Sequence, residues 1–195
     1  MSNLTDFFPS GGGGGLTPKF QEFTSSGFFT PSQALIDAGG YIEVFLVGGG
    51  GKSSSINDGS NGGEVLMKKM YLTIAQMNGV TVVIGSGTTV IGGSGGNSEF
   101  AASFGAGGVD LIASGGSPSL VQSSIASSSW GSRATYSFAY GFSAGNGIFG
   151  YGAGGASQDA GNGGGVSTGK ANSGQGAARN GTTSGSGYCL IKWYE

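Results

Sequence analysis

Residues 41–51 read Tyr-Ile-Glu-Val-Phe-Leu-Val-Gly-Gly-Gly-Gly, and this stretch decides the fold. Its first part, Tyr41–Val47, is apolar on both faces apart from Glu43, which is typical of a buried strand. The run Gly48–Gly51 follows the strand directly. At the other end of the chain, Gly185–Gly187 leads into a second apolar segment, Tyr188–Tyr194. Strands therefore bracket the glycine tracts.

Other strands are predicted on both sides of this stretch, and helical signals are nearly absent. The predicted strands are Glu64–Ile74, Thr81–Ile84 after a turn at Asn78-Gly79, the C-terminal Tyr188–Tyr194, and a weaker one at Lys19–Phe23. In the C-terminal strand, Cys189, Ile191 and Trp193 share one face and Lys192 lies on the other. A helix of about two turns fits only Pro31–Ala38, and Gly39-Gly40 ends it.

The glycine content, taken with the aromatic and charged content, indicates whether the glycine tracts are disordered or packed. Of 195 residues, 45 are glycine, whereas ordinary domains have about 7%. Disordered glycine-rich chains have few aromatic residues, yet this chain has 12 Phe, 7 Tyr and 2 Trp, and only 9% of it is charged. Collagen needs glycine at every third position and abundant proline, whereas this chain has four prolines and no strict period. We therefore expect glycine to serve close backbone packing.

A physical form for such packing is the polyglycine-II-like helix, with three residues per turn and no internal hydrogen bonds. Its amides and carbonyls point outward, so neighbouring copies without Cβ atoms can exchange N–H···O bonds. The predicted fold is mainly β: an antiparallel β-sheet or sandwich packed with glycine-rich, polyglycine-II-like helices and loops, with little or no α-helix.

Charge and side-chain chemistry argue against several function classes. Eight basic and ten acidic residues give a net charge of −2 without a basic patch, so neither nucleic acid nor a membrane is an expected partner. The chain has no histidine, and Cys189 is the sole cysteine, so the commonest general base and a cysteine zinc site are both lacking. Gly51-Lys52-Ser53 lacks the earlier glycine of a phosphate loop. We expect no enzyme activity, no catalytic residues, no cofactor and no metal.

Five segments, in order along the chain, match a known family. They are Phe23–Pro31 (FTSSGFFTP), Ile42–Val47 with its glycine run, Gly62–Val65 (GGEV), Val83–Gly87 (VIGSG), and Gly185–Trp193 (GSGYCLIKW). In this order they resemble the glycine-rich domain of bacteriophage tail fibres and tail-tip adhesins, over roughly residues 19–195. The serine-rich stretch 117–129 departs from that pattern. The resemblance implies a virion role, strands beside a polyglycine-II bundle, and contact with the host surface through exposed loops.

The expected organisation is an N-terminal leader, residues 1–18, followed by the glycine-rich domain, residues 19–195. The leader has no signal-peptide pattern, so we expect assembly in the host cytoplasm. The resemblance implies a final place on the virion. The leader resembles the leaders of phage structural proteins and would dock to other tail proteins through Leu4, Phe7, Phe8 and Pro9.

The expected function is that of a tail fibre or receptor-binding tip that attaches the virion to the host surface. The alternative is a purely architectural tail-tip, baseplate or capsid-surface component. The receptor would be a protein or a glycan. The resemblance implies a homo-oligomer, with a trimer favoured, because fibre proteins of this kind are often trimers whose closed symmetry buries exposed sheet edges.

Aromatic residues between the glycine tracts are the candidates for receptor contact, because aromatic side chains give a large contact area with few rotatable bonds. The candidates are Trp130, Tyr136, Tyr140, Phe149 and Tyr151. The alternative for each residue is that it fills a gap at the edge of a thin core.

Overall fold

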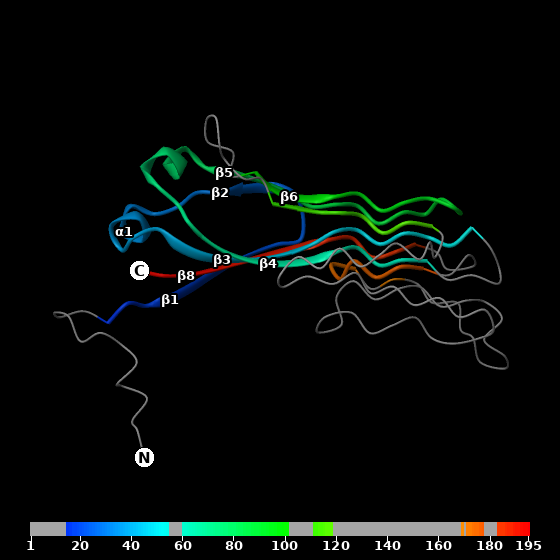
Figure 1. Ribbon diagram of the computed structural model, residues 1–195, viewed down its shortest axis with the longest axis horizontal. Helices are drawn as coiled ribbons and strands as arrows, with labels where there is room; N and C mark the ends of the chain where they lie inside the picture. Colours follow the sequence, from blue (N-terminus) through cyan, green and yellow to red (C-terminus); the bar gives the residue numbers. More distant parts are fainter. Residues whose placement is uncertain (1–14, 55–59, 102–110, 119–168, 170, 178–182) are drawn as a thin grey trace, which may run out of the picture.

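The computed structural model describes residues 15–54, 60–101, 111–118, 169, 171–177 and 183–195. Within these ranges the chain is mainly β, as the sequence predicts. Two antiparallel four-stranded sheets face each other: sheet A has the order β1-β8-β3-β4 and sheet B the order β2-β5-β6-β7 (Figure 1). The strands are β1 Pro18–Phe23, β2 Gly27–Phe29, β3 Tyr41–Val47, β4 Val65–Tyr71, β5 Val80–Val83, β6 Ser98–Ala101, β7 Leu111–Ala113 and β8 Tyr188–Tyr194.

Two short helical elements join the strands in the described part of the chain. Helix α1, Gln33–Asp37, begins where Ser32 Oγ accepts a hydrogen bond from the Leu35 N–H at 3.0 Å, and it buries Leu35 in the core. The 3-10 helix η2, Ile74–Asn78, lies between β4 and β5. The prediction of one strand through Ile74 was wrong at its end, because the chain turns at Thr73, which caps η2.

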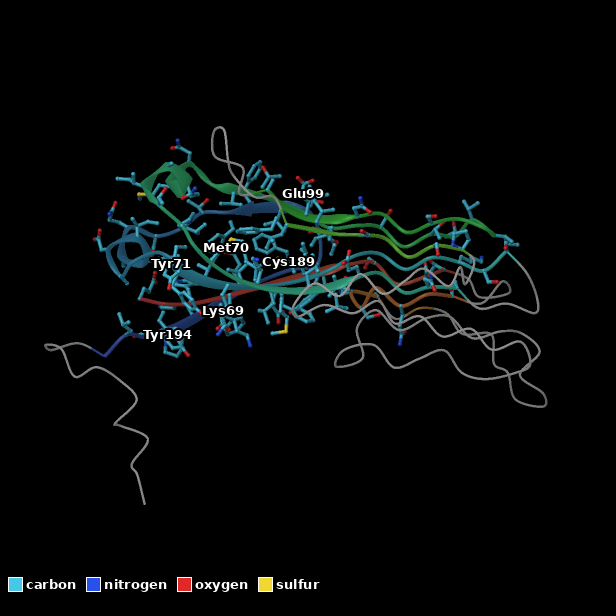
Figure 2. All side chains as sticks on the ribbon, in the orientation of Figure 1. Lys69, Met70, Tyr71, Glu99, Cys189 and Tyr194 are labelled. Atoms are coloured by element: carbon cyan, nitrogen blue, oxygen red, sulfur yellow. The ribbon has the colours of Figure 1, made fainter. Side chains whose placement is uncertain are left out.

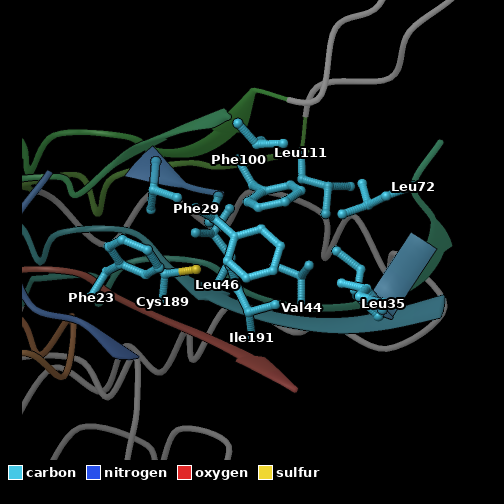
Figure 3. Packing of buried hydrophobic residues seen from close by; sticks show 14 residues of the cluster. Phe23, Phe29, Leu35, Val44, Leu46, Leu72, Phe100, Leu111, Cys189 and Ile191 are labelled. Atoms are coloured by element: carbon cyan, nitrogen blue, oxygen red, sulfur yellow. The ribbon is translucent and has the colours of Figure 1, made fainter. Parts of the chain in front are cut away.

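The core lies between the two sheets (Figure 3). Sheet A contributes Ile42, Val44, Leu46, Cys189 and Ile191, and sheet B contributes Phe29, Val80, Val82, Phe100 and Leu111. The ring of Phe29 lies 6.4 Å from that of Phe100 and 5.3 Å from that of Trp193. Each fully buried side chain of this size stabilises the fold by about 1.5–3 kcal/mol. The core therefore depends on interdigitated side chains from both sheets.

Strand β3 is buried on one face rather than two. Ile42, Val44 and Leu46 point into the core, whereas Tyr41, Glu43 and Phe45 are half-buried on the outer face of sheet A. The prediction of a strand buried on both faces was therefore wrong for the outer face, because no other layer of described chain covers it at these positions. The predicted alternation in β8 is confirmed: Cys189 and Ile191 are buried, and Lys192 is exposed.

Glycine-rich segments continue the strands beyond the sandwich (Figure 1). β3, β5 and β7 run directly into residues 48–53, 84–88 and 114–117, while residues 61–64, 93–97 and 183–187 run directly into β4, β6 and β8. Residues 173–177 lie against the same group, because Gly174, Gln175 and Ala177 all make backbone hydrogen bonds to it. We call these segments together the glycine bundle.

Hydrogen bonds from residues 48–53 follow a three-residue period. Residues three apart donate to the same neighbouring segment in two of three pairs, and the third pair donates to segments 183–187 and 173–177, which bond to each other. The N–H groups of Gly48 and Gly51 bond to Glu64 and Asn61 at 2.9 and 3.0 Å, those of Gly49 and Lys52 to Gly96 and Gly93 at 2.9 and 3.0 Å, and those of Gly50 and Ser53 to Gly185 and Ala177 at 2.8 and 3.0 Å. This is the period of a polyglycine-II-like helix. The packing of the glycine tracts as polyglycine-II-like helices stays a prediction.

Glycine is required in the bundle because any larger residue would place a Cβ atom against a neighbouring backbone. A Cβ added to Gly49 would lie under 3.0 Å from the Ser86 carbonyl oxygen, and one added to Gly50 equally close to that of Gln175. Neither glycine has a positive φ. The constraint is therefore the close approach of neighbouring backbones rather than an unusual conformation of the glycines themselves.

In the described part of the chain, neither helical element is long and apolar enough to cross a membrane.

Candidate binding surfaces

Neither set of residues predicted to bind partners can be placed. Trp130, Tyr136, Tyr140, Phe149 and Tyr151 lie outside the described residues. The leader residues Leu4, Phe7, Phe8 and Pro9 also lie outside them. Candidate surfaces must therefore come from the described part of the chain.

The first candidate surface is the turn at the far end of the bundle, residues 88–93, which we call the tip turn. It joins the segment that leaves β5 to the segment that returns to β6. In Figure 1 it lies at the end opposite β1 and the C-terminus. The Gly93 N–H donates to the Val90 carbonyl at 2.9 Å, and Gly92 has a φ of 75°. A hydrogen bond from the fourth residue to the first, with positive φ at the third, is typical of a type II turn.

The tip turn holds two aliphatic side chains in solvent. Val90 is 64% exposed and Ile91 is 53% exposed. Neither belongs to the hydrophobic clusters that pack the sandwich. Val90 and Ile91 therefore contribute nothing to the hydrophobic core.

The segment that follows β3 contacts the tip turn through Lys52 and Ser53. Lys52 is buried, and its Nζ donates to the Thr89 carbonyl at 2.9 Å. The Gly92 N–H donates to the Ser53 carbonyl at 3.3 Å. These contacts give Gly51-Lys52-Ser53 a structural role, since Lys52 and Ser53 hold the turn in place.

Val90 and Ile91 were not among the residues predicted from the sequence to bind a partner. The available signal was a run of four β-branched residues, Thr88–Ile91, between Gly87 and Gly92. β-Branched residues favour strands over turns, so such a run in a glycine tract is unusual.

The second candidate surface is the outer face of sheet A (Figure 2). Phe20, Tyr71 and Tyr194 are exposed there by 70%, 73% and 52%. Strand register places them on one face together with Glu43 and Lys69, whose side chains form an ion pair at 3.3 Å. This face carries apolar and aromatic surface at the sandwich end of the molecule, where the chain enters β1.

Polar contacts on this face are local. The Tyr41 hydroxyl donates to Glu43 at 2.9 Å. The pKa of Tyr41 is raised, first by burial and then by the hydrogen bond to Glu43. The pKa of Lys69 is raised by its contact with Tyr41 and then by Glu43. The cluster links β3 to β4 on an exposed face.

Cys189 carries the one thiol of the chain and lies in the core. Burial raises the pKa of its thiol to about 12, so almost no thiolate forms near neutral pH. Among the residues that the structure describes, no three His, Cys, Asp or Glu residues gather as a metal-binding group.

No protein-family model, curated protein or solved structure matches this chain.

Proposed function

We propose that the chain is a structural protein of a bacteriophage virion, a tail fibre or receptor-binding tip that attaches the particle to its host. The observation that carries the proposal is the glycine bundle. Strands of the sandwich continue into it, and backbone hydrogen bonds in three directions hold its segments together. Such an arm suits an attachment protein because it presents loops at a fixed distance from the body of the protein.

The topology of the bundle favours contact at its far end. The outgoing segment 48–53 and the returning segment 61–64 are joined there, as are 84–88 and 93–97. Ser117 lies at the end of another outgoing segment, residues 114–117. It lies beside Asn61, because the Asn61 N–H donates to the Ser117 carbonyl at 3.0 Å. The connection that contains Trp130, Tyr136, Tyr140, Phe149 and Tyr151 starts from this end.

Binding to host cells tests the proposal. The purified chain should bind to host bacteria and should slow adsorption of the phage when it is added first. A chain that folds but neither binds to cells nor slows adsorption would contradict the receptor-binding role.

The alternative, a purely architectural component, is favoured by the exposed aromatic side chains on the outer face of sheet A. Phe20, Tyr71 and Tyr194 lie on the part of the molecule where β1 begins, and an exposed apolar patch often marks an assembly surface. We propose that this end, with the leader, docks to other tail proteins. Deletion of residues 1–15 should release the folded protein from particles, and retention would contradict docking through the leader.

We also propose a homo-oligomer, with a trimer favoured. The edge strands β1 and β4 of sheet A are the edges that cyclic symmetry could cover. The mass of the purified protein in solution, measured by light scattering, tests this, and a monomer at micromolar concentration would contradict it.

A further inference from the structure

The tip turn combines two features that are rarely found together: exposed aliphatic side chains and a tightly held backbone. Val90 and Ile91 are each more than half exposed. Burial of either side chain would be favourable, yet the fold leaves both in water. Single exposed apolar residues are common on protein surfaces, so the significance of Val90 and Ile91 depends on how the turn is held.

Hydrogen bonds fix the tip turn from several directions. Within the turn, the Val90 N–H donates to Thr88 Oγ1 at 3.1 Å. From the segment that leads into β8, the Ser184 N–H donates to the Thr88 carbonyl at 3.0 Å, while Ser184 Oγ accepts from the Thr88 N–H at 2.6 Å. From the segment that follows β3, Lys52 and Ser53 bond to Thr89 and Gly92. The turn is therefore anchored to two other segments of the bundle.

A held turn loses little conformational freedom when it binds. The entropy lost on binding is small for the side chains of Val90 and Ile91 as well, because short, branched side chains have few rotamers. Two adjacent aliphatic side chains in a fixed position can enter an apolar pocket without first being ordered.

We propose that Val90 and Ile91 insert into an apolar surface of a protein receptor on the host cell. This deepens the proposed function and rests on it. Val and Ile side chains have no hydrogen-bonding group and no aromatic face. Within residues 88–93, side-chain hydroxyls come from Thr88 and Thr89 alone, and no residue is charged. Recognition of a glycan depends on hydrogen bonds and stacking on aromatic faces, so this turn fits an apolar protein surface better.

The test compares two matched variants of the full chain. V90S/I91S removes the apolar contact, and Ile74→Ser removes an equally exposed aliphatic side chain, 71% exposed, from η2 at the sandwich end. Binding of labelled protein to host cells is titrated for each. We expect V90S/I91S to weaken binding by about tenfold or more, whereas Ile74→Ser binds like wild type. Ile91→Leu, which keeps an apolar side chain, should retain most of the binding.

Treatment of the cells separates the two kinds of receptor. Wild-type binding should disappear after proteinase K and survive periodate oxidation of surface glycans. Loss with periodate but not with protease would overturn the proposal in favour of a glycan. Wild-type affinity in V90S/I91S would overturn it while leaving the proposed function intact.

Two further outcomes are decisive. Absence of wild-type binding to any cells would contradict the proposed function itself, and this inference with it. The melting temperatures of the variants show whether the turn substitutions disturb the fold. If V90S/I91S melts lower than wild type, Val90→Ala with Ile91→Ala, which keeps both Cβ atoms, replaces it in the same comparison, and wild-type affinity in that variant again overturns the proposal.

Discussion

The sandwich and the glycine bundle are built from the same strands but are held together differently. In the sandwich, side chains such as Phe29 and Phe100 fill the space between two sheets. In the bundle, backbones lie so close that a Cβ on Gly49 or Gly50 has no room. Residues in β3 bond to two neighbouring strands in one plane, whereas the next residues along the chain bond in three directions. The chain therefore gains a third hydrogen-bonded neighbour where the side chains of β3 give way to the run Gly48–Gly51.

This comparison predicts opposite tolerances to substitution. The sandwich should lose stability when a side chain becomes smaller, and the bundle should lose stability when a side chain becomes larger.

The largest effect is expected in the sandwich. Phe100→Ala removes a fully buried ring that packs near Phe29, and it should lower the free energy of unfolding by about 3–5 kcal/mol. Phe100→Leu, which leaves a smaller cavity, should cost clearly less. Urea denaturation followed by tryptophan fluorescence measures both. Equal stability of Phe100→Ala and wild type would show that the sandwich is not held by this core.

The bundle should show a similar sensitivity to the addition of one methyl group. Gly50→Ala brings a Cβ against the Gln175 carbonyl and should cost about 3 kcal/mol, the upper end for overpacking. Gly27→Ala in β2 is the matched control, because its Cβ would make ordinary contacts with Phe23 at 3.5 Å and should cost under about 0.5 kcal/mol. If the same denaturation experiment gives the two variants equal stability, close packing in the bundle is refuted.

The junction between the two regions depends on a buried hydroxyl. Ser98 Oγ donates to the Val47 carbonyl at 2.6 Å and accepts from the Gly85 N–H at 2.8 Å. Ser98→Ala leaves both buried groups without this partner and should cost about 1–3 kcal/mol. Ser26→Ala removes a comparable bond at an exposed site, from the Ile84 N–H at 3.0 Å, and should cost less. Thermal unfolding of the two variants ranks the effects, and the reverse order would contradict this role for Ser98.

The smallest effect on stability near neutral pH is expected from the ionisation of Cys189. Its pKa is raised to about 12 by burial, above the unfolded value of about 8.5. The stability linked to this thiol is therefore fully present below about pH 8.5 and declines as pH rises towards 12. At pH 8 the folded thiol should resist Ellman's reagent, and urea should make it reactive. Rapid labelling of the native protein would show that the sandwich opens readily.

The sequence predicts the sandwich better than the bundle surface. Strands β3 and β8 were predictable because their apolar runs are long, and α1 because Gly39-Gly40 ends it. The short strands β2, β6 and β7 escaped prediction, since three or four residues carry too little periodicity. The sequence could not indicate which glycine segments are neighbours, because glycine has no side chain whose pattern would reveal its contacts. The position of Val90 and Ile91 on a fixed turn could not be predicted either, because the turn is held by Lys52, Ser53 and Ser184, which lie far away in the sequence.

Amide hydrogen exchange tests the central claim most directly, namely that the glycine bundle is a hydrogen-bonded scaffold. The N–H groups of Gly49, Gly50 and Gly51 bond to three different neighbouring segments at 2.8–3.0 Å. In the native protein, NMR should therefore find these amides protected to within about tenfold of Val44 and Leu46 in β3. Exchange of the three glycine amides at the rate of an unstructured peptide, while β3 stays protected, would contradict the account and make the glycine tract a flexible linker.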